Sequence, residues 1–112
     1  MIKPLLDPQI EIEINKALLA RERGIEGQAR VCARRAAGLA VRKYLEQSNS
    51  PINNNKSAYE LLLSIINHPE ITATARKNAV NLTLRVTETF QMPVNVDLIE
   101  EARSLCEQLA NL

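Results

Sequence analysis

The sequence predicts an all-α protein, an antiparallel up-and-down bundle of about five helices. The chain is 46% apolar, yet it has one Phe, two Tyr and no Trp, and such aliphatic composition is typical of cores made by packed helices. Apolar residues recur three and four positions apart in several stretches, and no stretch alternates with the period of a strand. Because 112 residues suffice for one domain, we expect residues 1–112 to fold as a single bundle.

The first helix is expected from Pro8 to Arg23. Asp7 supplies an N-cap, and Pro8 takes the first helical position, where its missing N–H costs nothing. Gly24 is expected to end this helix, and Gly27 to prolong the break before the next. The apolar face that follows the cap is formed by Ile10, Ile14, Ala17 and Leu18.

The second helix is expected from Gln28 to Gln47 and is rich in alanine. Small residues stand three and four positions apart along it, so that another backbone can approach closely. A symmetric dimer can also use such a surface. We therefore interpret one face as a helix-contact face or a dimer face, formed by Ala33, Ala36, Ala37 and Ala40. The polar residues 48–56 that follow predict a flexible loop.

Three further helices follow in the second half. Ser57 and Glu60 fit a capping box that opens the third helix, which His68-Pro69 ends. The fourth begins near Thr72, with its stripe at Ala75, Ala79, Leu82 and Val86. Asp97 caps the fifth, whose stripe is Leu98, Ala102, Leu105, Leu109 and Leu112.

The charges are balanced overall but not along the chain. Fourteen Lys and Arg against thirteen Asp and Glu give a net charge of +1, which argues against nucleic-acid binding through bulk charge. The second helix nevertheless carries two adjacent rows of arginine, and a fourth helix packed beside it would extend the patch. Arginine forks suit phosphates. The candidate phosphate-binding or partner-binding residues are Arg30, Arg34, Arg35, Arg42, Arg76 and Lys77.

Two plainer interpretations of these bases stay open. Runs of charge are commonly solvated helix faces. The arginines could also form salt bridges, within the chain or between subunits, to the acidic fifth helix, where Glu100, Glu101 and Glu107 are found.

The sequence indicates no catalytic, metal-binding or cofactor-binding set. One His and two distant Cys lack the spacing of zinc ligands, and the glycines lack the strand-to-helix setting of a phosphate loop. We interpret Cys32 and Cys106 as small buried apolar side chains, and His68 as a cap on the last carbonyls of the third helix. Because no such set is indicated, we expect a non-enzymatic protein with no cofactor. We expect it to be cytoplasmic, because neither a signal peptide nor a membrane-spanning run is found.

The run from Arg34 to Leu45, RRAAGLAVRKYL, resembles the second-helix signature of the HEPN superfamily. The polar loop followed by Ser57 to Leu62 is similar to that family's next helix, and so is the proline-containing loop before the late helix with Glu101-Ala102. The resemblance implies a small helical bundle that dimerises. Members of the family are RNA-cleaving toxins or partners of small nucleotidyltransferases.

The resemblance also implies that the family's nuclease site is missing here. Active members carry an arginine followed after four to six residues by a histidine. With Arg85 in the place of that arginine, the corresponding positions hold Phe90, Gln91 and Met92. Gly38 also stands where the family usually has a glutamate.

Three functional hypotheses result. The leading one is a non-catalytic HEPN-like module that forms a homodimer and binds a nucleotide, RNA or a protein partner such as a nucleotidyltransferase. The alternative is a tetratricopeptide-like adaptor, because residues 18–45 could form one helical hairpin, although no 34-residue repeat follows. A ribonuclease with an atypical site made from Arg34, Arg35, Arg85 or His68 is the least favoured.

Overall fold

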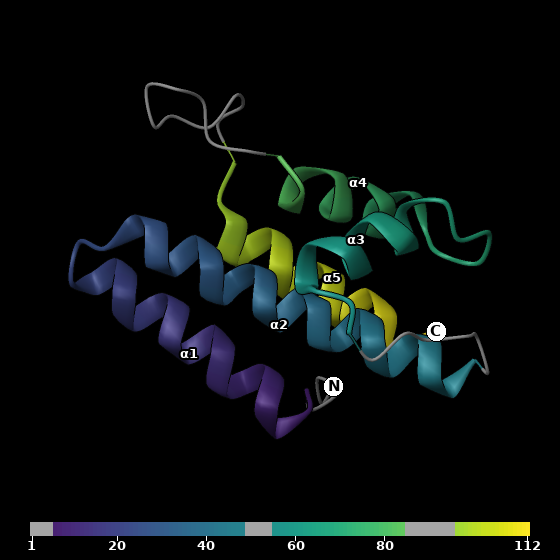
Figure 1. Ribbon diagram of the computed structural model, residues 1–112, viewed down its shortest axis with the longest axis horizontal. Coiled ribbons are helices and arrows are strands. Elements are labelled where there is room, and N and C mark those ends of the chain that lie inside the picture. The colour runs from purple at the N-terminus through teal and green to yellow at the C-terminus, as the bar shows by residue number, and fades with distance from the viewer. Residues whose placement is uncertain (1–5, 49–54, 85–95) are drawn as a thin grey trace.

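The computed structural model describes residues 6–48, 55–84 and 96–112 of the chain. Within those ranges all regular structure is helical, which confirms the predicted all-α bundle (Figure 1). None of the helices there combines the length and apolar character needed to span a bilayer. The helices are α1 (Pro8–Glu22), α2 (Glu26–Gln47), α3 (Ala58–Ile66), α4 (Ala73–Leu82) and α5 (Leu98–Ala110).

The long helix α2 lies at the centre and packs against α1, α3 and α5. α1 runs antiparallel to α2 (Figure 1). α4 runs antiparallel to α5, because Thr72 at its start donates a hydrogen bond to Gln108, at 3.0 Å, and Asn81 near its end donates one to Glu101, at 2.6 Å. Helices α1, α2, α4 and α5 therefore alternate in direction, and α3 is a short helix placed between α2 and α4.

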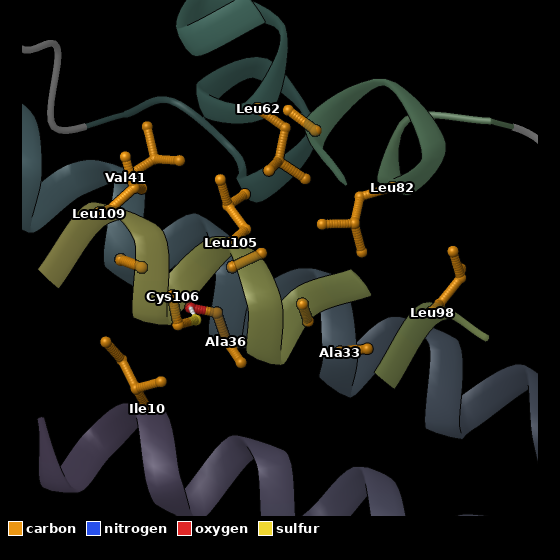
Figure 2. Packing of buried hydrophobic residues seen from close by; sticks show 14 of the residues in the cluster. Ile10, Ala33, Ala36, Val41, Leu62, Leu82, Leu98, Leu105, Cys106 and Leu109 are labelled. Carbon is orange, nitrogen blue, oxygen red and sulfur yellow. Dashed lines mark hydrogen bonds between the residues drawn. The ribbon is translucent and has the colours of Figure 1, made fainter. Parts of the chain in front are cut away.

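The core is aliphatic, as the composition predicts. Leu62 of α3 and Leu82 of α4 point towards α5, and Leu105 of α5 lies between them and α2 (Figure 2). All three side chains are fully buried. Burial of this apolar surface is the main force that stabilises the bundle.

The alanine face of α2 is a helix-contact face inside one chain. Ala33, Ala36 and Ala37 are completely buried, and Ala40 is 5% exposed. α5 packs on this face, where the Cys106 thiol donates a 3.7 Å hydrogen bond to the Ala36 carbonyl (Figure 2). Of the two interpretations of the alanines, the structure supports helix contact, because a second copy of the chain has no access to them.

Gly38 is the point where α3 approaches α2 without an intervening side chain. A Cβ atom built on Gly38 would lie 2.7 Å from the Ala58 Cβ and 2.9 Å from its Cα. Both distances are shorter than van der Waals contact, and the Cα belongs to backbone that cannot rotate away. Only glycine at position 38 therefore allows the first turn of α3 to sit where it does.

The N-terminal caps of the helices follow the prediction. Asp7 accepts a hydrogen bond from the Gln9 N–H, and Ser57 and Glu60 form the reciprocal capping box. Gly24 has φ +76° and makes the turn after α1 without help from Gly27, because glycine adopts the left-handed region without steric cost. The prediction that Gly27 prolongs the break is wrong, since α2 already begins at Glu26.

Two predicted core positions are exposed. Leu18 is 40% exposed because the buried stripe of α1 continues through Ala17 to Ala20, and Leu18 is rotated about 100° from Ala17. Leu112 is 55% exposed because it lies beyond the end of α5. Val86 and most of the predicted flexible loop 48–56 lie outside the described residues.

Arg21 joins the ends of three helices. Its guanidinium donates to both carboxylate oxygens of Asp97, at 2.9 Å, and to Glu26, at 2.7 and 3.2 Å. Burial of Asp97 opposes ionisation, but the hydrogen bonds from Arg21 and from backbone N–H groups outweigh it and lower the pKa of that carboxyl. This cluster places the start of α5 beside the start of α2.

Replacement of Gly38 by Ala is predicted to destabilise the protein. The added methyl group collides with Ala58. Such overpacking costs about 1–3 kcal/mol, and better helix propensity offsets at most about 1 kcal/mol of it. The free energy of unfolding in urea measures the effect.

Gly27→Ala is the matched control, because no atom lies within 4 Å of a Cβ built there. It is expected to leave stability unchanged or to raise it slightly. An equal gain in stability in both variants would contradict the close contact between α2 and α3.

Candidate functional site

Arg34 on α2 supports the fold. Its Nε donates to the Leu82 carbonyl and its Nη2 to the Leu84 carbonyl, both at 2.8 Å. These carbonyls lie at the C-terminal end of α4, where a helix leaves acceptors without partners and carries partial negative charge. The arginine fork therefore holds the end of α4 against α2.

Arg76 on α4 does the same for α3. Its Nε donates to the Ile66 carbonyl at 2.8 Å, and its Nη2 donates to the His68 carbonyl at 3.2 Å. His68 was expected to cap these carbonyls, and that prediction is wrong. Its Nδ1 instead accepts a 3.4 Å hydrogen bond from the Glu70 N–H, and its ring meets that of Tyr44 edge-on.

The sequence would let α4 extend the arginine patch only if α4 packed beside α2, and in the described residues its main neighbours are other helices. α4 packs mainly against α5 and α3, so Arg76 faces the end of α3 and Lys77 is exposed on α4, while Arg34 of α2 reaches the C-terminal end of α4. Arg30 is partly buried on α2. None of the ion pairs among the described residues joins the α2 arginines to α5. The ion pair that reaches the start of α5 comes from Arg21.

Two of the predicted arginines, Arg35 and Arg42, line a cavity of about 240 Å³ between α1, α2 and the start of α3. Gly38 and Ala58 form part of its wall, so the close approach of these helices also shapes the cavity. Three cationic side chains and one carboxylate line it together with apolar groups. The lining residues are Glu13, Arg35, Gly38, Leu39, Arg42, Lys56, Ala58 and Leu61.

Each of the three cations that line this cavity keeps N–H donors that no described residue uses. Arg35 is exposed and makes no hydrogen bond or ion pair within the part of the chain that the structure describes. Arg42 uses Nη2 to donate to the Lys56 carbonyl at 3.1 Å, and the Lys56 ammonium donates to Ser64 at 3.1 Å. The first contact holds the Arg42 guanidinium against the backbone of Lys56. Both side chains line the cavity with Arg35, and positive charges that line one cavity favour a bound anion.

Sequence reasoning missed Lys56 and Glu13. Lys56 precedes the Ser57 capping box, and its place beside Arg42 results from the return of the chain to α2. Glu13 precedes the buried Ile14 on α1. A single charged residue next to a buried one matches no sequence motif, so nothing in the sequence marked Glu13 as part of a site. The spacing of Arg35 and Arg42, two helical turns apart, was the one signal of this site.

A second cavity of about 230 Å³ lies between the start of α1 and the ends of α2 and α5. The ion pair between Asp7 and Lys43, 2.7 Å long, lines it, and so does Cys106. Burial raises the pKa of the Cys106 thiol to about 12. The thiol is therefore neutral and is a buried apolar group, as predicted, like Cys32.

Among the described residues no three His, Cys, Asp or Glu side chains form a group that could hold a metal ion. The positions that correspond to the HEPN nuclease motif, Arg85 and residues 90–92, lie outside the described ranges. No protein-family model, curated protein or solved structure matches the chain. The resemblance to HEPN proteins therefore rests on the sequence residues alone.

Arg34→Met and Arg35→Met are predicted to differ sharply although the residues are neighbours. Loss of the Arg34 fork leaves two helix-end carbonyls without a donor, which costs about 1–3 kcal/mol. Truncation of the exposed Arg35 side chain is expected to change the free energy of unfolding by no more than about 0.5 kcal/mol. Urea unfolding of both variants measures the difference, and equal effects would contradict the structural role of Arg34.

Proposed function

We propose that this protein is a binding module for a small phosphate-bearing ligand, held in the cavity between Arg35, Arg42 and Lys56. The observation that carries the proposal is the convergence of three cations in one cavity, one of which has no partner among the described residues. Arginine forks and a lysine ammonium are the groups that bind phosphate oxygens in proteins. A nucleotide, one of the ligands expected from the sequence, belongs to this class.

The size and charge of the site favour a small ligand over RNA. RNA binding needs an extended basic surface or stacking aromatic side chains, whereas Arg34 and Arg76 donate to helix-end carbonyls and Lys77 lies elsewhere. A cavity of about 240 Å³ is smaller than the roughly 300–1,000 Å³ of pockets that enclose drug-sized ligands. It fits a phosphate and the group next to it.

A homodimer, expected from the sequence, would need a surface other than the alanine face. Ile12 and Leu19, which lie seven residues apart on the outer side of α1 and are 52% and 45% exposed, are candidates for such a surface.

The adaptor hypothesis gains no support from the helix lengths. A tetratricopeptide-like pair of hairpins needs helices of similar length, but α3 and α4 have 9 and 10 residues, whereas α1 and α2 have 15 and 22. We therefore retain the non-catalytic binding module as the leading function.

Inorganic phosphate is predicted to raise the melting temperature of the wild-type protein more than chloride at equal ionic strength. A ligand that binds only the folded state stabilises it, by about 1.4 kcal/mol at ten times the Kd. In Arg35→Gln the specific part of this rise is lost, because a direct phosphate contact is removed. Thermal unfolding followed by circular dichroism measures the shift.

Lys77→Gln is the control. It removes the same charge from α4, which contributes no residue to the cavity lining, and it keeps the general stabilisation that phosphate gives by exclusion from protein surfaces. The control is expected to behave like the wild type. An identical phosphate response in all three proteins would contradict the proposed function.

A further inference from the structure

The wall of the cavity is apolar between its charged side chains. Leu39 of α2 and Ala58 of α3 are partly exposed and line it, and the buried Gly38 and Leu61 complete the same wall. Ligand sites commonly combine such apolar walls with a few polar groups that orient the ligand. Phosphate binding alone does not explain this wall, because a phosphate gains nothing from contact with apolar groups.

The lining offers no partner to a hydroxyl group. Its described residues include no Ser, Thr, Asn, Gln or Tyr. The carboxylate of Glu13 is not an open acceptor, because its Oε1 pairs with the Lys16 ammonium at 3.4 Å and its Oε2 is covered by protein. A hydroxyl that entered the cavity would therefore leave water without gaining a side-chain acceptor there, which is unfavourable.

The cations and the volume set the other limits. Arg35, Arg42 and Lys56 keep N–H donors, which suit the oxygens of a phosphate group. The volume of about 240 Å³ is below the roughly 300–1,000 Å³ of sites for drug-sized ligands, so it admits a phosphate and a short chain. An aliphatic chain would bury apolar surface against Leu39 and Ala58, and such burial favours binding.

We infer that the ligand is a short-chain aliphatic phosphate monoester, with its phosphate at Arg35, Arg42 and Lys56 and its carbon chain against Leu39 and Ala58. This inference rests on the proposed function, because it assigns the chemistry of the ligand in the same cavity. Leu39 is then a specificity-determining residue, which selects an apolar chain over a hydroxylated one such as a sugar.

The test compares methyl phosphate, n-propyl phosphate and glycerol 3-phosphate. The full chain is titrated with each at about pH 8, where all of them carry two negative charges because their second pKa is about 6, and Kd is taken from amide chemical shifts in NMR. We expect n-propyl phosphate to bind about tenfold more tightly than methyl phosphate, because each of the two additional methylenes favours binding roughly three- to fourfold. Glycerol 3-phosphate has the same three-carbon chain and is expected to lose most of this gain, since its hydroxyls leave water without a partner.

Leu39→Asn tests the apolar wall directly. It replaces the side chain with a polar one of similar size, so the preference for n-propyl phosphate over methyl phosphate is expected to fall towards one. Leu63→Asn is the matched control, because Leu63 is a 44% exposed leucine of α3 that does not line the cavity. It is expected to keep the tenfold preference.

Equal affinity of the wild type for methyl and n-propyl phosphate, or tighter binding of glycerol 3-phosphate than of n-propyl phosphate, overturns the inference. A preference that persists in Leu39→Asn overturns the role of Leu39. If inorganic phosphate still binds and Arg35→Gln weakens it, the proposed function stands. Failure of inorganic phosphate and of all the esters to bind the wild type overturns the proposed function as well.

An aliphatic phosphate monoester also occurs as the headgroup of a lipid. Flotation with vesicles of phosphatidylcholine and phosphatidic acid distinguishes that source from a free ester. We expect no association with these vesicles, because the cavity admits only a short chain. Association with the vesicles without binding of n-propyl phosphate overturns the inference. The comparison of the esters on the wild type decides the inference even if Leu39→Asn does not fold.

Discussion

The position of α3 depends on the absence of a side chain at Gly38. With Ala58 so near that a methyl group on Gly38 would overlap its backbone, the first turn of α3 rests directly on the middle of α2. The same two residues form part of the cavity wall. They hold the segment with Lys56 close to Arg42, whose guanidinium donates to the Lys56 carbonyl. One contact between two backbones thus determines both the path of the chain after α2 and the shape of the candidate site.

The small residues of α2 explain why this helix is central. Ala33, Ala36 and Ala37 are fully buried, and side chains of this size let the α2 backbone approach its neighbours closely. The sequence predicted this packing role because alanine side chains carry no functional group, and at helical spacing they form a face that another backbone can approach closely. It could not say whether the neighbour was another helix of the chain or a second copy, since both require the same small residues.

The arginines show where sequence reasoning ends. Arg34 and Arg35 have the same chemistry and adjacent numbers, but side chains of successive helical residues point about 100° apart. Arg34 reaches the end of α4, and Arg35 points to the cavity rim. Helix spans, caps and the buried stripes were predictable from local patterns, whereas these roles depend on where α3 and α4 return to α2. Lys56 and Glu13 were missed for the same reason, because only tertiary packing brings them to the cavity that Arg42 lines.

The measurement that tests the central claim most directly is a titration of the 15N-labelled protein with inorganic phosphate at constant ionic strength, followed by amide chemical shifts. Our account predicts saturable shifts confined to the residues around the cavity, near Glu13 on α1, between Arg35 and Arg42 on α2, and from Lys56 to Leu61. Weak shifts that do not saturate, or shifts spread over the surface of α4 and α5, would contradict the claim that this cavity binds phosphate.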